Sequence, residues 1–144
     1  AQERLGKFDT AVACFQKVIS LDSLHHRSLN YLGYMYAERG LHLDTADVYL
    51  RRALSVDSTN GAYWDSYGWV MYQKKKFSEA AAAVQKAVDA REDDPVIFEH
   101  MARIQESLGD RAKAAFYWKK LLDIDPQNEK AKEALAGAGA HSPR

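Results

Sequence analysis

The chain has 144 residues, of which 47% are hydrophobic and 28% are charged, and its 20 Lys and Arg residues balance its 20 Asp and Glu residues. This composition is typical of a folded protein rather than a disordered one, and the zero net charge gives no overall attraction to nucleic acid or to an acidic membrane. The single cysteine excludes an internal disulfide and a cysteine-based zinc site, and no apolar run approaches the ~18 residues that a membrane span needs.

Equivalent residues recur along the chain at intervals of 34 or 35 residues. One column contains only alanine: Ala11, Ala46, Ala80 and Ala114. A second column, offset by seven residues, contains Val18, Ala53, Ala87 and Leu121. A third column contains small residues: Gly33, Gly68, Ala102 and Ala136. A period of this length indicates stacked units of supersecondary structure.

Residues 1–25 predict a half repeat that consists of a single helix. Its apolar stripe contains Phe8, Ala11, Phe15 and Val18, and the helix that would pair with this stripe is missing. Since the chain opens without an initiator Met, we expect it to be part of a longer protein, with Phe8 and Phe15 serving either oligomerisation or packing on upstream repeats. Cys14 is expected to be a small, partly buried apolar residue.

Residues 26–60, 61–94 and 95–128 predict three full units, each a pair of antiparallel helices. Within 61–74, an apolar stripe at i, i+3, i+4 and i+7 contains Trp64, Tyr67, Gly68 and Met71, and a second stripe starts at Phe77. Asp94-Pro95 supplies a capping side chain and a preset φ at a helix start. The stripe of the last unit places Trp118 in the core.

A last helix over 129–138 is predicted to cap the stack. Its Lys and Glu residues, among them Lys130 and Glu133, would form a polar outer face, while Ala131, Ala134 and Leu135 turn inward. Residues 139–144 predict a flexible tail because they are small and polar.

These motifs make the chain resemble the tetratricopeptide repeat family. The family pattern of a bulky residue, Leu-Gly, Tyr, Ala, Phe and Ala is met in one unit by Leu29, Leu32-Gly33, Tyr36, Ala46, Leu50 and Ala53. The resemblance implies an all-α fold, a right-handed α-solenoid of stacked antiparallel helix pairs, and a single solenoid domain over residues 1–138. The sequence around Tyr31-Leu32-Gly33-Tyr34 also resembles that of bacterial cell-envelope repeat proteins. This resemblance favours a bacterial periplasmic or envelope location over the cytoplasm.

Motifs with a known catalytic mechanism are absent from the sequence, including Gly-rich phosphate loops, His-Glu-x-x-His and Gly-x-Ser-x-Gly. We therefore predict a protein that is not an enzyme and needs no cofactor. No metal site is expected, because His25 and His26 are sequence neighbours that point in different directions and the other histidines lack a ligand-spaced partner. The one basic run, Lys74-Lys75-Lys76, is expected to be a solvated turn rather than a nucleic-acid contact.

The resemblance also implies which residues line the concave face, since this family uses set positions of each first helix for that purpose. Carried onto this chain, the predicted partner-binding residues are Asn30, Tyr31, Tyr34, Asp65, Trp69, Tyr72, Glu99, His100 and Arg103. Aromatic residues at groove positions are not accounted for by core burial, and Tyr34, Trp69 and Tyr72 are expected to form one aromatic strip that binds a partner. The alternative is that these side chains pack against groove-side neighbours in adjacent units.

The sequence therefore predicts a protein–protein interaction module, a scaffold or adaptor that binds a peptide or protein segment in this groove and does not bind nucleic acid or insert into a membrane. Co-chaperone members of the family hold a peptide carboxylate with Lys and Asn, whereas the corresponding pairs here are Asn30-Tyr31, Asp65-Ser66 and Glu99-His100. Asp65 and Glu99 would repel an acidic C-terminus. The alternative function is a structural module that forms a homo-oligomer or stacks through its terminal faces.

Overall fold

The computed structural model describes residues 2–90 and 93–140, with side chains for residues 6–90 and 93–137. All regular structure in these ranges is helical. The helices are α1 (Gln2–Leu21), α2 (His26–Arg39), α3 (Leu43–Val56), α4 (Gly61–Gln73), α5 (Phe77–Ala90), α6 (Pro95–Leu108), α7 (Arg111–Ile124) and α8 (Glu129–Ala140). The predicted all-α fold is confirmed. None of these helices is both long and apolar enough to cross a membrane.

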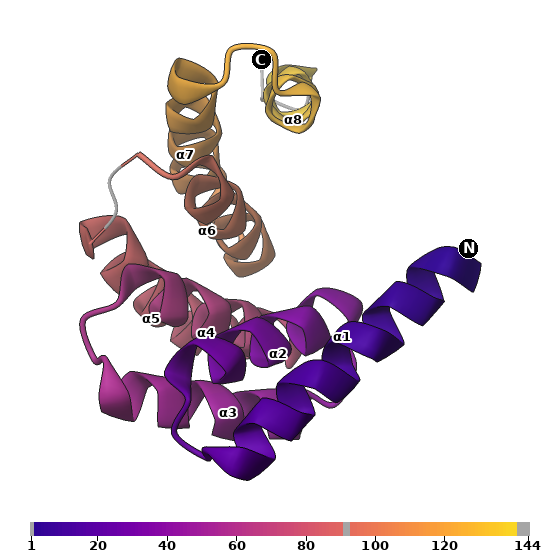
Figure 1. Ribbon diagram of the computed structural model, residues 1–144. Helices are drawn as coiled ribbons and strands as arrows, with labels where there is room; N and C mark the ends of the chain where they lie inside the picture. The colour runs from indigo at the N-terminus through magenta and orange to yellow at the C-terminus, as the bar shows by residue number, and fades with distance from the viewer. Residues whose placement is uncertain (1, 91–92, 141–144) are drawn as a thin grey trace.

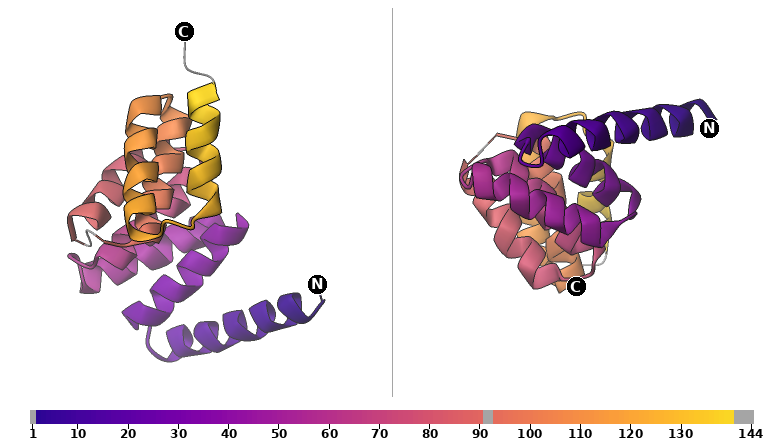
Figure 2. Two further views of the ribbon diagram at one scale, coloured as in Figure 1. Left: turned by 90° about the horizontal axis from the view of Figure 1, so that it is seen from above. Right: turned by 60° about the horizontal axis from the view of Figure 1, so that its bottom comes forward.

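The helices form a solenoid of pairs, in which α2 packs on α3, α4 on α5 and α6 on α7 (Figure 1). Each second helix also contacts the first helix of the next pair, so that α3 meets α4 and α5 meets α6. The first helices contact one another as well, α2 with α4 and α4 with α6. Figure 2 shows α1 and α8 at opposite ends of this stack, where α1 contacts α2 and α8 contacts α7.

The helix ends are fixed by local hydrogen bonds. The carboxylate of Asp94 accepts a 2.9 Å hydrogen bond from the Val96 amide before Pro95 opens α6, and the Asn60 side chain accepts a 3.2 Å bond from the Tyr63 amide at the start of α4. Gly40 ends α2 with φ 65°, a left-handed conformation that glycine adopts without a steric penalty. At the other end, α8 continues to Ala140, beyond the predicted end at residue 138, and residues 141–144 of the predicted tail lie outside the described residues.

Within a pair, the two helices approach closely at the column of small residues. A Cβ atom added to Gly68 would lie 2.4 Å from Val84 Cγ2 and 3.2 Å from the Ala80 carbonyl oxygen. At the equivalent Gly33, the added Cβ would lie 2.9 Å from Leu50 Cγ. These positions therefore let α5 lie directly against the backbone of α4, and α3 against that of α2.

Lys74 is not the solvated residue that its basic run predicts. Its ammonium lies 2.9 Å from an Asp44 carboxylate oxygen and 3.4 Å from one of Asp47, and its side chain is mostly buried. The expectation was wrong for Lys74 because the end of α4 lies beside the start of α3, where both aspartates are found. Lys75 and Lys76 are exposed, as expected.

The two phenylalanines of α1 pack on this chain. Phe8 lies under the Arg39 guanidinium, with its ring centroid 3.9 Å from Arg39 Cζ, and Phe15 stacks on Tyr31 with ring centroids 5.6 Å apart. The face of α1 that carries Ala11, Cys14 and Val18 is different, because no helix of the described residues covers it. The prediction of a partly buried Cys14 was wrong. Its side chain is exposed because no helix of the described residues covers this face of α1.

We predict that Gly68→Ala destabilises the fold by about 1–3 kcal/mol, because the new methyl group would overlap Val84 and crowd the α5 backbone. Gly6→Ala is the control, since nothing lies within 4 Å of the site in α1 and alanine gains about 0.5–1 kcal/mol over glycine in a helix. Thermal and urea unfolding followed by circular dichroism measure both variants. Equal stability of the two variants would contradict the close approach.

Candidate protein-interaction groove

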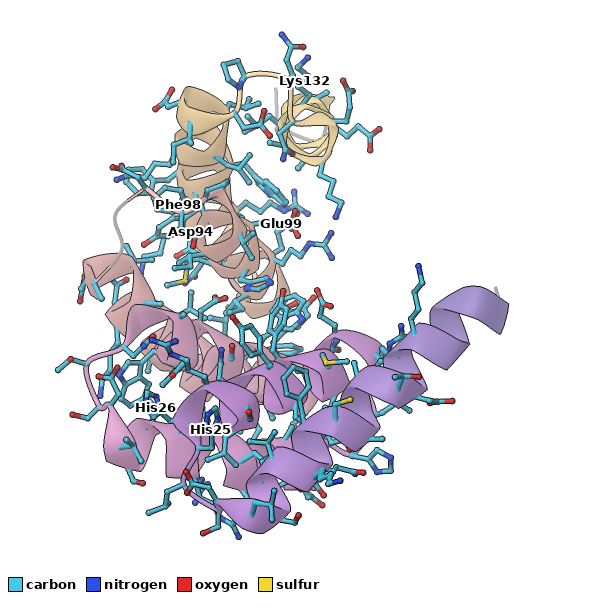
Figure 3. All side chains as sticks on the ribbon, in the orientation of Figure 1. His25, His26, Asp94, Phe98, Glu99 and Lys132 are labelled. Atoms are coloured by element: carbon cyan, nitrogen blue, oxygen red, sulfur yellow. The ribbon has the colours of Figure 1, made fainter. Side chains whose placement is uncertain are left out.

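A groove of about 620 Å³ runs between the first helices α2, α4 and α6 and the terminal helix α8. The predicted site residues that line it are Tyr34, Trp69, Glu99, His100 and Arg103. Figure 3 shows Glu99 pointing from α6 toward the side where α8 lies, whereas Phe98 points to the opposite side. The fold thus brings residues from three repeats, distant in sequence, into one concave surface.

An aromatic stack forms the floor of the groove. The Trp69 ring lies parallel to the Tyr72 ring, with centroids 4.3 Å apart, and parallel to the His100 ring, with centroids 4.0 Å apart. Because one face of an indole has room for one ring at this distance, Tyr72 and His100 lie on opposite faces of Trp69. The Tyr34 ring centroid lies 6.4 Å from that of His100. The stack therefore links α2, α4 and α6.

A buried polar pair holds the stack in place. His100 Nδ1 lies 2.8 Å and 3.0 Å from the two carboxylate oxygens of Asp65, and the exposed fractions of these residues are 3% and 6%. Burial of a carboxylate is costly unless it has a hydrogen-bonding partner, and here the imidazole is that partner. The pair joins α4 to α6 and fixes the orientation of the ring that stacks on Trp69.

The expectation that burial could not account for the groove aromatics was wrong for Trp69, which is only 7% exposed and belongs to the hydrophobic core. The first helices lie side by side, so a residue that faces the groove on α4 also contacts α6. Trp69 therefore follows the alternative prediction, because it packs against a groove-side neighbour, His100, in the adjacent unit. Tyr34 and Tyr72 are half-buried and keep part of their surface in the groove region.

Asn30 and Tyr31 lie apart from the groove just described. Tyr31 is 56% exposed and stacks on Phe15 of α1 rather than on the Trp69 stack. The side-chain oxygen of Asn30 is buried and has no hydrogen-bond partner among the described residues. The structure thus brings together the predicted residues of α4 and α6 with Tyr34, but not these two residues of α2.

Acidic and basic side chains lie around the aromatic stack. Glu99 lies between two cations, with carboxylate oxygens 3.6 Å from Arg103 Nε and 3.6 Å from Lys130 Nζ. The pKa of Tyr34 is raised, chiefly by burial and also by the nearby carboxylates of Glu38, Asp65 and Glu99. This rise in the pKa reports the burial of the Tyr34 phenol beside these carboxylates and leaves its charge at neutral pH unchanged.

Sequence reasoning missed Lys130, which it assigned to the polar outer face of the cap. Its side chain instead reaches back to Glu99 and lines the groove. The repeat spacing could have predicted a groove position for Lys130. This residue follows Arg27, Ala62 and Val96 in a column that the family resemblance places in the groove.

Comparison with known proteins agrees with this architecture. One family profile described as a tetratricopeptide repeat matches residues 1–58 and 43–95, and a second with the same description matches residues 97–128. The chain belongs to the tetratricopeptide repeat family. Its fold is similar to a crystal structure of MamA, with a TM-score of 0.80 and 23% identity over 95% of this chain and 80% of that chain.

Two further TPR domains are also similar in fold. The Arabidopsis OM64 TPR domain gives a TM-score of 0.74 with 19% identity, over 81% of this chain and 96% of that chain. The first TPR of Spaghetti (RPAP3), bound to the HSP90 peptide SRMEEVD, gives a TM-score of 0.74 with 19% identity, over 83% of this chain and 94% of that chain. At these identities the likeness concerns the fold.

We predict that His100→Phe destabilises the protein by about 3 kcal/mol, because it keeps an aromatic ring beside Trp69 but leaves the buried Asp65 carboxylate without the imidazole. The double variant Asp65→Leu/His100→Phe should recover most of the loss, since both polar partners are then replaced by apolar groups. Urea unfolding measures both. A single variant as stable as the wild type would show that the pair contributes nothing to the fold.

Proposed function

We propose that this chain is a protein–protein interaction module, a scaffold or adaptor, whose concave face binds a peptide or protein segment. The observation that carries the proposal is the groove itself, in which accessible edges of Tyr34 and the Arg103 side chain lie beside an internally packed aromatic stack. Aromatic residues and arginine are the types enriched where interfaces gain most of their affinity.

Preorganisation supports this proposal. Trp69 is held between two rings, and His100 is held by Asp65, so these side chains have no rotamer freedom left to lose when a partner binds. Binding to a rigid surface costs less conformational entropy than binding to a mobile one. In this proposal Trp69 and His100 shape the floor, while Tyr34, Tyr72 and Arg103 make the direct contacts.

Side chains of both charges line the groove. The HSP90 peptide on the TPR domain of RPAP3 reads SRMEEVD and is rich in carboxylates. In the groove of this chain, the carboxylates of Glu38 and Glu99 lie among Arg39, Arg103 and Lys130, and Glu99 already pairs with the last two. We therefore infer a partner segment that carries polar groups of both charges and not only carboxylates.

A second candidate function, assembly through the exposed face of α1, is favoured by the repeat itself. Ala11 and Val18 are partly exposed, and Leu21, one turn further along the helix, is 80% exposed. The equivalent alanines of the next two units are fully buried by a first helix: Ala46, Ala53, Ala80 and Ala87. The natural occupant of the α1 face is therefore another amphipathic helix with a small residue at its centre.

Peptides that bind the wild-type chain are first selected from a displayed random library, and these peptides are then used to test the groove. We expect Tyr34→Ala to weaken the binding of these peptides about tenfold, roughly 1.4 kcal/mol, and Arg103→Glu to change which peptides bind and how binding depends on salt. Phe116→Ala and Lys119→Glu, at exposed positions of α7, are the matched controls. Selected peptides that respond to the α7 variants and ignore the groove variants would refute the proposal.

Assembly is tested separately by light scattering over a range of protein concentrations. If the α1 face mediates self-association, Val18→Glu should shift the equilibrium toward monomer because it places a charge in an apolar interface. The same substitution at Val48, an exposed residue of α3, should leave the equilibrium unchanged. A wild-type chain that stays monomeric at every concentration removes this second function.

A further inference from the structure

The imidazole of His100 uses one of its two nitrogens within the described part of the chain. Nδ1 lies 2.8 Å and 3.0 Å from the carboxylate oxygens of Asp65, whereas Nε2 has no hydrogen bond there. The fully enclosed side-chain nitrogen and oxygen atoms that lack a partner in this part of the chain are Asn30 Oδ1 and Trp118 Nε1. Since Nε2 is not one of them, it keeps some accessible surface. His100 is 3% exposed and lines the groove, so this surface faces the space where a partner would lie.

The Asp65 carboxylate determines which nitrogen of His100 carries the proton. A carboxylate accepts hydrogen bonds and does not donate them, so the nitrogen beside it is an N–H donor. The shared proton lies on the ring because a carboxylate is a weaker base than an imidazole. A neutral imidazole has one donor and one acceptor. With Nδ1 as the donor, Nε2 of the neutral ring is an acceptor.

The packing of the His100 ring fixes the position of Nε2. The ring lies parallel to that of Trp69, with an interplanar angle of 16° and centroids 4.0 Å apart. A half-turn about the bond between the ring and Cβ would exchange Nδ1 with a carbon atom and leave the buried Asp65 carboxylate without its donor. Because an unpaired buried charge is costly, the ring keeps one orientation. Nε2 is therefore a preorganised hydrogen-bonding atom.

Ionisable side chains from four helices face the region around His100. Besides Asp65, they are Tyr34, Glu38 and Arg39 of α2, Glu99 and Arg103 of α6, and Lys130 of α8. None of them bonds Nε2 in the described part of the chain, and the two glutamates have other partners. Glu38 accepts a hydrogen bond from the Tyr34 hydroxyl, and Glu99 lies beside Arg103 and Lys130. Nε2 is thus free to bond a group of the partner.

We propose that Nε2 of His100 accepts a hydrogen bond from an N–H group of the bound segment, and that acid pH converts this acceptor into a donor. The proton gained at acid pH goes to Nε2, because Nδ1 already carries one. The groove then favours a carbonyl or carboxylate at this point instead of an N–H group. This inference rests on the proposed function, because His100 lies in the proposed binding groove. Asp65 is a positioning residue, since it acts through His100.

The first test reads the protonation of the ring directly. Long-range ¹H–¹⁵N NMR spectra of the wild-type chain, recorded from about pH 5 to about pH 8, distinguish a ring nitrogen with a proton from one without. The spectrum of His100→Phe identifies the His100 signals. We expect a proton on Nδ1 alone at the upper end of this range and on both nitrogens at the lower end. A ring with its proton on Nε2 alone, or with both protons at about pH 8, overturns the inference.

The second test follows binding as a function of pH. Peptides that lack histidine are selected on the wild-type chain at about pH 8, and fluorescence anisotropy measures their affinity over the same range. We expect affinity to fall about tenfold as His100 gains its proton, with the same midpoint as the NMR change, because two N–H groups then face each other. Affinities without this midpoint overturn the inference.

The variant Asp65→Asn changes the proton on His100 without altering the side chains that make the direct contacts. The amide N–H of the new residue can donate to Nδ1, which moves the proton of the neutral ring to Nε2. We expect the NMR signal of this tautomer and about tenfold weaker binding at about pH 8. Asp47→Asn is the matched control, since Asp47 is also buried but pairs with Arg51 and Lys74, which do not line the groove. It should leave both readouts unchanged.

The outcomes separate this inference from the proposed function. Circular dichroism checks that Asp65→Asn is folded, and if it is not, the two measurements on the wild-type chain still decide. Peptides that lose affinity in Tyr34→Ala but ignore both pH and a folded Asp65→Asn overturn the role of His100, while the groove remains a peptide site. If the selected peptides ignore every groove variant, the proposed function fails and this inference fails with it, whatever tautomer the NMR spectra show.

Discussion

The close approach of the two helices in each pair is the constraint on which the rest of this structure depends. At Gly68 there is no Cβ, and Val84 takes the place that a side chain would need. The same contact recurs at Gly33 against Leu50, and Ala102 occupies the equivalent position in the third pair. Since every pair closes on the same side, the opposite sides of α2, α4 and α6 are aligned, and the concave groove is the consequence.

The groove changes in character along the stack. Between α2 and α6 it is packed with rings, because Trp69, Tyr72 and His100 contact one another and the Asp65 carboxylate orients the imidazole. Toward α8 its lining changes, because Gly137 follows Tyr34, Trp69 and Arg103 at the repeat spacing, and charged side chains of α6 and α8 line the cavities there. The aromatic floor therefore leads into a space that is lined by small residues and by charged side chains of both signs.

The sequence was sufficient to predict the helix pairs, because the repeat period and the apolar stripes are local patterns. It did not predict the burial of Trp69 or the ion pairs of Lys74, since both depend on the angle at which one repeat packs on the next. Spacing within one helix says which way a residue points but not what the neighbouring helix places there. The Asp65–His100 pair could have been found, because the two residues lie one repeat apart in adjacent groove columns.

In the function proposed for this chain, the first helices, and not the second ones, form the binding surface. The most direct measurement is the map of backbone amide NMR shifts when the wild-type chain is titrated with one peptide selected from a random library. We expect the shifted amides to lie in α2, α4, α6 and α8, around Tyr34, Tyr72 and Arg103. Shifts confined to α3, α5 and α7, or to the exposed face of α1, would contradict it.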